Sequence, residues 1–253
     1  MRVGKSNEMS TALTGKVVVL TGAAKRIGAA VAEDLARAGA RIVINYRNSR
    51  GAAESLVDRL TRAGAEALAV GGDLAEAGEA ARLLEQTLQH FGRVDALIAN
   101  ASTFHRTPLA GLTDEQWDEA VTNNLTVAAL PAIHFGRWMK EHEGGTIITL
   151  ADVAGLRPWR DYLPYSVGKA GVIALTRGLA KELAPEVRVN AVAPGPILFP
   201  DDMPEPGRQR ELDRTLLKRA GTPAHIAGAI RFLLENDYVT GVLLPVDGGR
   251  GLA

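Results

Sequence analysis

Short runs of apolar, often β-branched residues recur along the chain, and stretches with apolar residues at helical spacing separate them. The runs predict strands at 17–20, 41–46, 66–70, 94–100, 145–150, 187–192 and 241–246. The stretches between them predict helices at about 27–38, 51–63, 76–90, 114–141, 163–183 and 223–234. Strands that are apolar on both faces and alternate with helices are typical of a parallel sheet covered on both sides.

Seven strands in this rhythm predict an α/β fold, with one doubly wound Rossmann-type domain over residues 14–253 and helices on both faces of a seven-stranded parallel sheet. Residues 1–13 are polar and predict a flexible tail, and Met1 and Met9 are both candidate starts. Residues 194–222 break the rhythm and begin with five prolines in thirteen residues. We interpret this segment as a substrate loop at the carboxyl edge of the sheet, with a tolerated surface insertion as the alternative.

Composition excludes several classes of partner. Lys plus Arg number 29, as do Asp plus Glu, so the zero net charge argues against nucleic acid or an anionic membrane as the main partner. The chain has no cysteine, which excludes disulfides and thiolate metal sites and favours a cytoplasmic location. Its five histidines show no metal-binding spacing, and no apolar run approaches the ~20 residues that span a bilayer.

The segment TGAAKRIG (21–28) lies between the first predicted strand and the first predicted helix. Backbone N–H groups at a helix N-terminus suit a pyrophosphate, Gly22 permits a tight turn, and Gly28 permits close packing of helix and strand. An ordinary strand-to-helix connection fits the two glycines equally well. Arg26 stands where a third glycine is expected, so the cation needs an explanation of its own.

The end of the second strand indicates which nicotinamide cofactor binds. Sites that prefer NAD place Asp or Glu there to accept from the ribose 2′-OH, whereas this chain has Arg47 flanked by Tyr46, Asn48 and Ser49. An arginine pairs well with the additional 2′-phosphate of NADPH, and Lys25 adds positive charge nearby. The alternative is a solvated strand end.

Two further strand ends carry small or polar residues. Asp73 and Glu76 predict a capping box for the third helix, and Asp73 with Leu74 is also a candidate contact to adenine. The segment NAS (100–102) supplies small residues that allow a cofactor to lie against the strand ends, although a plain exit from a strand has the same composition.

Tyr165 and Lys169 are spaced i, i+4, which places them on one face of a helix. At ~4 Å and an effective dielectric of about 20, a lysine ammonium stabilises a phenolate by ~4 kcal/mol. We therefore expect Lys169 to bring the pKa of Tyr165, ordinarily about 10, near neutrality. The pattern is also common by chance on exposed helices.

The combination of motifs is more specific than any one of them. TGxxxRxG, NAS, Asn124 within NNLT, Y-x-x-x-K, PGP and PVDGG occur in order, and from about residue 14 to 253 the chain resembles the short-chain dehydrogenase/reductase family. The resemblance implies that Tyr165 donates a proton, that Lys169 binds the nicotinamide ribose and lowers the tyrosine pKa, and that Asn124 holds a relay water. With the loop positions it implies cofactor contacts from Gly22, Lys25, Arg26, Ile27, Tyr46, Arg47, Asn48, Ser49, Asp73, Leu74, Asn100, Ala101, Ser102, Tyr165, Lys169, Pro194, Gly195 and Ile197.

One residue departs from the family pattern. The usual serine thirteen residues before the tyrosine is Asp152 here, within TLADVAG. Reduction of C=O builds an alkoxide, and a carboxylate ~4 Å away would cost about 4 kcal/mol, or nearly three decades in rate. Protonation of Asp152 would relieve this cost. A carboxyl group suits C=N bonds and ring N–H donors better, since it supports protonation of a ring nitrogen. The alternative is an aspartate that caps the next turn.

Arg26, Asp152, Phe104 in NASTF and the DDMP segment at 201–204 together resemble the pteridine reductases within that family. The resemblance implies an NADPH-dependent reductase of dihydropterins, and of oxidised pterins and folates. Phe104 would stack the pterin against nicotinamide, Arg26 and Ser102 would contact pterin and phosphate, and Asp152 and Tyr165 would share proton transfer. For Phe104 alone, a place in the core is the alternative.

Other functions stay open. A dihydromonapterin or dihydrofolate reductase would share this chemistry, whereas a ketone, sugar or 3-oxoacyl reductase would have Ser at 152 and Gly at 26, and neither is present. A non-catalytic NADP(H)-binding sensor would tolerate loss of Tyr165 and Lys169, which are intact. Apolar faces on helices 114–141 and 163–183 favour a homotetramer, unless they pack on the sheet; the residues are Trp117, Leu125, Leu130, Ile133, Val172, Leu175 and Leu179.

Overall fold

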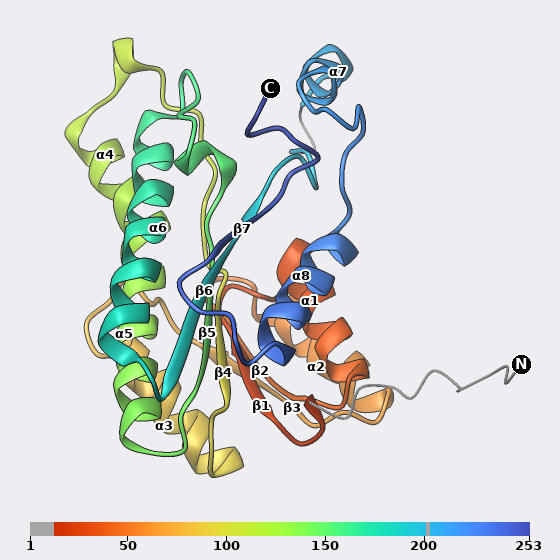
Figure 1. Cartoon of the computed structure of the whole chain (residues 1–253), viewed down its shortest axis with the longest axis vertical. Coiled ribbons are helices and arrows are strands. Elements are labelled where there is room, and N and C mark those ends of the chain that lie inside the picture. Colours follow the sequence, from red (N-terminus) through yellow and green to blue (C-terminus); the bar gives the residue numbers. More distant parts are fainter. Residues whose placement is uncertain (1–12, 201–202) are drawn as a thin grey trace, which may run out of the picture.

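A computed structural model describes residues 13–200 and 203–253 (Figure 1). Within them, seven strands form one parallel sheet in the order β3-β2-β1-β4-β5-β6-β7. The strands are β1 (Val17–Leu20), β2 (Arg41–Tyr46), β3 (Ala67–Gly71), β4 (Ala96–Ala99), β5 (Gly145–Leu150), β6 (Val187–Pro194) and β7 (Leu243–Val246). The order reverses between β1 and β4, where the carboxyl ends of such strands leave a crevice for ligands. The predicted fold class is confirmed.

Helices cover both faces of the sheet (Figure 1). One layer holds α1 (Arg26–Arg37), α2 (Arg50–Arg62) and α8 (Pro223–Glu235), and the other holds α3 (Glu79–Phe91), α4 (Asp114–Val121), α5 (Val127–Glu141) and α6 (Leu163–Leu183). The remaining helix, α7 (Glu205–Asp213), stands apart from both layers at the upper end of the molecule.

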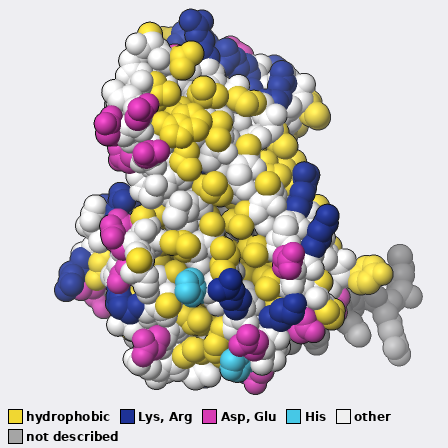
Figure 2. Space-filling view, turned by 90° about the vertical axis from the view of Figure 1, so that its left-hand side faces the viewer, with side chains coloured by type: hydrophobic (Ala, Val, Ile, Leu, Met, Phe, Trp, Pro, Cys, Tyr) yellow, Lys and Arg dark blue, Asp and Glu magenta, His cyan; other side chains and the backbone are white. Residues whose placement is uncertain are grey.

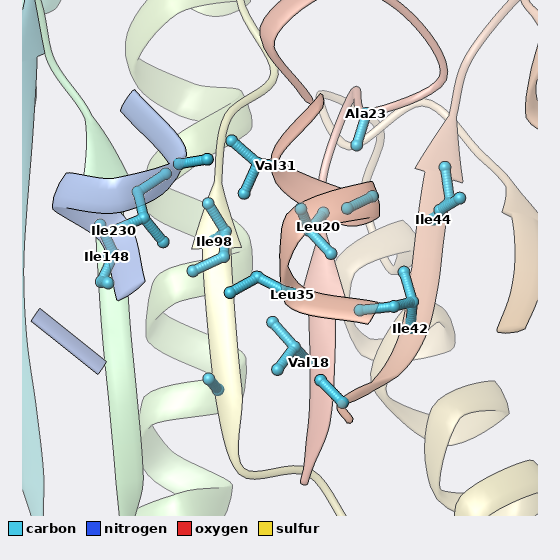
Figure 3. Close-up of a cluster of buried hydrophobic side chains, with 14 of the residues drawn as sticks. Val18, Leu20, Ala23, Val31, Leu35, Ile42, Ile44, Ile98, Ile148 and Ile230 are labelled. Carbon is cyan, nitrogen blue, oxygen red and sulfur yellow. The ribbon is translucent and has the colours of Figure 1, made fainter. Parts of the chain in front are cut away.

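Alternating side chains on the strands divide the core between the two helical layers. Val18 and Leu20 of β1 pack in the cluster with residues of α1 and α8, which Figure 3 shows in close-up. Val17 and Val19 point to the opposite face and pack with α5, including Phe135. All four valines and leucines of β1 are fully buried. Burial of side chains of this size contributes about 1.5–3 kcal/mol each, which fixes the sheet that carries the site.

Two expected boundaries are wrong. Leu13, assigned to the tail, is buried in the core and belongs to the domain, while residues 1–12 lie outside the described part of the chain. The predicted capping box does not form, because α3 begins at Glu79 after Gly78 in the left-handed region. The carboxylate of Asp73 instead accepts from the Ala75 N–H at 3.0 Å and forms a local turn.

The expected helix over 114–141 is interrupted. A π-helical turn, Thr122–Thr126, joins α4 to α5 and holds Asn123 and Asn124 buried. Such turns occur mostly at functional sites, because the additional residue redirects neighbouring side chains. The expected loop at 194–222 contains α7, whose sequence EPGRQRELD carries too few apolar residues to give a helical pattern. Asp201 and Asp202 of the DDMP segment lie outside the described residues.

The face formed by α4, α5 and α6 carries a band of hydrophobic side chains (Figure 2). Val172 is fully buried against the sheet, but the other six residues named for the assembly remain partly exposed. The homotetramer therefore stays a prediction. None of the helices in the described ranges is long and apolar enough to cross a membrane.

Candidate active site

A cleft of about 890 Å³ opens at the carboxyl ends of the strands. Loops after β1, β2, β4, β5 and β6 and part of α7 line it. It contains all but one of the site residues expected from the sequence, which come from positions far apart along the chain. They are Gly22, Lys25, Arg26, Ile27, Tyr46, Arg47, Asn48, Ser49, Asp73, Leu74, Asn100, Ala101, Ser102, Phe104, Asp152, Tyr165, Lys169, Pro194, Gly195 and Ile197. The exception is Asn124.

The turn after β1 packs closely against the loop after β4. Gly22 has a φ of +59°, and a Cβ there would lie 2.7 Å from the Ala101 Cα. A Cβ on Gly28 would lie 2.6 Å from the Ala23 Cα. The Asn100 side chain donates to the carbonyls of Thr21 at 2.9 Å and Gly22 at 3.1 Å, which joins this turn to the loop after β4.

The N-terminus of α1 is suited to an anion. Its N-cap residue, Lys25, makes no side-chain cap, and no acidic residue lies in the first turn. The backbone N–H groups of that turn therefore remain available for a phosphate group at the positive end of the helix. Together with the close-packed glycines, these features fit the pyrophosphate of a dinucleotide cofactor.

Arg26 has a glycine-like backbone. Its φ of +55° lies in the left-handed region, which costs a non-glycine residue roughly 1–3 kcal/mol. The guanidinium donates to the Leu198 carbonyl at 3.0 Å and so ties the loop after β6 to the turn after β1. The bulky cation in the nucleotide turn thus holds a second wall of the cleft, while its expected contacts with phosphate and substrate stay predictions.

At the end of β2, Arg47 lies at the edge of the cleft. Its guanidinium donates to Asn123 at 3.1 Å and to Asp73 at 3.4 Å, and its side chain is 43% exposed. An ion pair as open as this contributes at most about 1 kcal/mol, so an incoming anion displaces it at little cost. The acidic side chain next to Arg47 in the cleft lining is Asp73, which follows β3 and not β2.

The centre of the cleft is a buried carboxyl–phenol pair. The Tyr165 hydroxyl donates to Asp152 Oδ2 at 2.8 Å. The other carboxylate oxygen accepts from the Ala154 N–H at 2.7 Å, at the start of a short 3₁₀ turn. One oxygen therefore caps the turn, as the alternative interpretation expects, and the other contacts the tyrosine. The part of Asp152 in proton transfer stays a prediction.

Lys169 lies on α6, about one helical turn after Tyr165, and is 3% exposed. Its ammonium donates to the Leu150 carbonyl at the end of β5, at 2.8 Å. The ammonium is 5.8 Å from the centre of the Tyr165 ring. The sheet therefore holds the lysine, and its ammonium lies near the tyrosine ring.

The charges of the three groups are coupled. Burial raises the pKa of Asp152 above its usual value, against the Ala154 N–H and the Lys169 charge. Burial, the Asp152 charge and the Asp152 hydrogen bond raise the pKa of Tyr165 well above 10. Burial lowers the pKa of Lys169 to about 8, opposed by Asp152. The expectation that Lys169 brings the pKa of Tyr165 near neutrality is wrong here, because burial and the neighbouring Asp152 carboxylate both raise it. Tyr165 stays protonated and able to donate.

Asn124 lies behind the cleft and is 1% exposed. The Ser102 hydroxyl, which lines the cleft, donates to Asn124 Oδ1 at 2.8 Å. The Asn124 amide donates to the Ala120 carbonyl at 2.9 Å, a bond that the π turn allows. Asn124 thus orients Ser102 in this structure, and its relay role stays a prediction.

A group of aromatic rings adjoins Tyr165. Phe104 is 38% exposed, so it is not a core residue. Its ring stacks on Tyr162 at 4.5 Å and meets the edges of Tyr165 at 5.0 Å and Trp159 at 6.1 Å. The partners Trp159 and Tyr162 were not predicted, because loop residues give no periodic signal. One face of Phe104 already has an aromatic partner, and stacking against nicotinamide remains a prediction.

A third residue missed from the sequence is Arg250, near the C-terminus. It is 7% exposed, its guanidinium lies 5.5 Å from the Trp159 ring, and it donates to Glu211 of α7 at 3.1 Å. It therefore joins α7 to the aromatic wall, and its charge opposes the rise in the Asp152 pKa. Among the residues described, no group of three or more His, Cys, Asp or Glu is placed to hold a metal ion.

Known proteins resemble this chain over almost its whole length. A family model described as enoyl-(acyl carrier protein) reductase matches residues 22–250. A 3-oxoacyl-(acyl-carrier-protein) reductase of Synechocystis sp. is 39% identical, over 94% of this chain and 98% of the relative. A 3-oxoacyl-(acyl-carrier-protein) reductase of Staphylococcus epidermidis is 31% identical, over 92% and 98%. The crystal structure of NAD+-bound xylitol dehydrogenase has a TM-score of 0.89 at 28% identity, covering 94% and 99%.

The depressed pKa of Lys169 predicts how stability varies with pH. Between pH 8 and about 10 the unfolded chain keeps this proton and the folded protein loses it, so the free energy of unfolding should rise with pH. Lys169→Met should flatten that slope in urea titrations at pH 7.5–10. Lys181→Met, at an exposed lysine on the same helix, should keep it. An unchanged slope in Lys169→Met would contradict the burial of a titrating ammonium.

Proposed function

Because the chain belongs to the short-chain dehydrogenase/reductase family, a group of oxidoreductases that bind a nicotinamide cofactor, we propose that it is an NADPH-dependent reductase of C=N bonds in pterin-type heterocycles. The observation that carries the proposal is the 2.8 Å hydrogen bond from Tyr165 to Asp152. Dihydropterins are the first substrate class, with oxidised pterins and folates as further members.

Proton transfer rests on the carboxyl–phenol pair. When bound, NADPH supplies the hydride that adds to the carbon of the C=N bond. Tyr165 donates its proton to the ring nitrogen, and Asp152 in its protonated form returns a proton to the phenolate through their hydrogen bond. Burial favours that protonated form, since it raises the pKa of Asp152. The Lys169 ammonium stabilises the negative charge that passes between the two oxygens.

The same pair disfavours a simple ketone. Reduction of C=O places an alkoxide next to the tyrosine. Whenever Asp152 is ionised, its carboxylate repels that alkoxide by about 4 kcal/mol at ~4 Å, and protonation of Asp152 removes the repulsion. A ring nitrogen instead gains a proton without developing an oxyanion, and neighbouring ring N–H groups can donate to the carboxylate. The exposed ring of Phe104 adds an apolar wall that suits a flat heterocycle.

Arg47 and Lys25 support NADPH as the cofactor. Both line the cleft where the ribose end of a dinucleotide is expected, and the open ion pair of Arg47 leaves its guanidinium able to pair with a 2′-phosphate. The N-terminus of α1 supplies N–H groups for the pyrophosphate.

The relatives favour a second candidate, reduction of a 3-oxoacyl thioester. Two of those compared are named 3-oxoacyl-(acyl-carrier-protein) reductases, and they cover this chain almost completely. Their names support this candidate better than they support pterin reduction. The site itself supports the pterin candidate, because Asp152 and Arg26 stand at positions where we expect Ser and Gly in a ketone reductase.

Replacing Asp152 tests the proposed function. Asp152→Ser should lower kcat for dihydrobiopterin about a hundredfold or more, the usual contribution of a proton-transferring group. The dissociation constant of NADPH should change less than about threefold, because Asp152 acts on the proton and not on the nucleotide. Reduction of a 3-oxoacyl thioester should increase in the same variant.

Asp152→Asn is the matched control for proton transfer, since the amide keeps the size of the side chain and accepts a hydrogen bond but carries no acidic proton. Stopped-flow and steady-state measurements on both variants check the result. Wild-type dihydrobiopterin turnover in either variant would remove Asp152 from the mechanism.

Replacing Arg47 tests the choice of cofactor. Arg47→Glu should weaken NADPH binding by roughly a hundredfold, because a carboxylate repels the 2′-phosphate that the guanidinium pairs with. NADH binding should hold or improve, since a carboxylate accepts from the 2′-OH. Arg62→Glu, an exposed position on α2, controls for net charge. If Arg47→Glu keeps the NADPH preference in fluorescence titrations, the assignment of Arg47 is wrong.

A further inference from the structure

A second, larger groove adjoins the active-site cleft. It has a volume of about 1350 Å³, and its walls are residues 106–110 from the loop after β4 and residues 158–161 and 163 from the loop after β5, with Arg210 of α7 at one side. We name it the arginine groove, since Arg106, Arg160 and Arg210 line it. Trp159 and Arg210 line both the groove and the cleft, so the two spaces are contiguous.

The two loops that form the groove hold each other in place. The Thr107 N–H donates to the Asp161 carbonyl at 2.7 Å, and the Arg106 guanidinium pairs with the Asp161 carboxylate at 2.7 Å. Asp161 itself has a φ of +66°. The walls are thus joined by backbone and side-chain bonds, and they also carry Trp159, the ring that meets Phe104.

Positive charge in the groove is not compensated. Among the described residues of its lining, Asp161 is the one acidic residue, and it is already paired with Arg106. Arg160 and Arg210 are exposed and make no ion pair with any residue in the described ranges. Figure 2 shows Lys and Arg side chains gathered at the upper end of the molecule, where these loops lie. Two unpaired guanidinium groups beside apolar walls raise the local concentration of anions.

The walls also hold polar atoms without partners. Thr107 Oγ1 and Trp159 Nε1 are buried and make no hydrogen bond with described residues. Thr107 as a whole is 8% exposed. Both atoms have almost no exposed surface, so a ligand in the groove does not reach them, and the argument for the groove rests on its two arginines.

We propose that the arginine groove is a binding subsite for a negatively charged tail on the substrate whose ring is reduced in the cleft. The inference rests on the proposed function for the ring and extends it to the rest of the molecule. Arg160 and Arg210 bind the anionic end, and the apolar wall of Trp159, Pro108 and Leu109 packs along the chain that leads to it. On this basis a glutamyl conjugate of a pterin, which ends in carboxylates, binds more tightly than a pterin with a neutral side chain.

The experiment compares ligands that differ only in charge at the tail. Dihydrofolate is paired with dihydrobiopterin in turnover with NADPH, and folate is paired with biopterin in calorimetry with NADP+. Arg160→Glu should raise the KM of dihydrofolate and the Kd of folate about tenfold. The same variant should change kcat, the KM of dihydrobiopterin and the Kd of biopterin by less than about twofold. Arg160→Lys should keep most of the affinity for dihydrofolate and folate. Arg62→Glu should change the affinity for neither the charged nor the neutral ligands.

A second pair separates this subsite from the proposed function. A coenzyme A 3-oxoacyl thioester carries phosphates, and its N-acetylcysteamine analogue carries none. If only thioesters turn over, the proposed pterin function is wrong. The subsite is then tested by whether Arg160→Glu weakens binding of the coenzyme A thioester but not of its N-acetylcysteamine analogue. An equal effect of Arg160→Glu on charged and neutral members, or no effect on either, would overturn the subsite whichever ring is reduced.

Discussion

The site depends on one hydrogen bond, from the hydroxyl of Tyr165 to the carboxylate of Asp152, in the lining of the cleft. A carboxylate and a phenol so close together cannot both lose a proton, because the second negative charge would lie beside the first without solvent. The pair therefore holds at least one proton at neutral pH. The buried ammonium of Lys169 reduces the cost of the remaining charge, so the three groups titrate as a unit.

The parallel sheet determines where these groups meet. β5 ends at Leu150, whose carbonyl holds Lys169, and Asp152 follows two residues later. The N-terminus of α6 brings Tyr165 to the same edge, while the π turn before α5 directs Asn124 towards Ser102. The close approach of the turns after β1 and β4, at Gly22, leaves a shallow floor for a nucleotide beside this cluster. Nucleotide and proton donor thus share one cleft because strand ends share one edge.

Most of the fold could be predicted, because strands buried on both faces leave long β-branched runs and amphipathic helices leave a 3.6-residue period. α7 gave no such signal, because it is polar and packs on neither layer. The π turn could not be predicted, because the apolar pattern continues through it as in an ordinary helix. In the site, the residues of the motifs at the strand ends could be predicted from the sequence. Trp159 and Arg250 were missed, and the pKa of Tyr165 was misjudged, because packing between distant loops determines contacts that spacing does not encode.

The central claim is that the Asp152–Tyr165 pair is built to protonate a ring nitrogen and not a ketone oxygen. The names of the relatives favour the thioester, and the proposal for a ring nitrogen rests on the carboxyl group of Asp152. The most direct test measures NADPH oxidation by the unmodified protein with dihydrobiopterin and a 3-oxobutyryl thioester in parallel. The account predicts that kcat/KM for dihydrobiopterin exceeds that for the thioester by roughly a hundredfold. An ionised Asp152 repels the alkoxide of the thioester by ~4 kcal/mol, and partial protonation of Asp152 reduces that repulsion. Turnover of the thioester alone would contradict it.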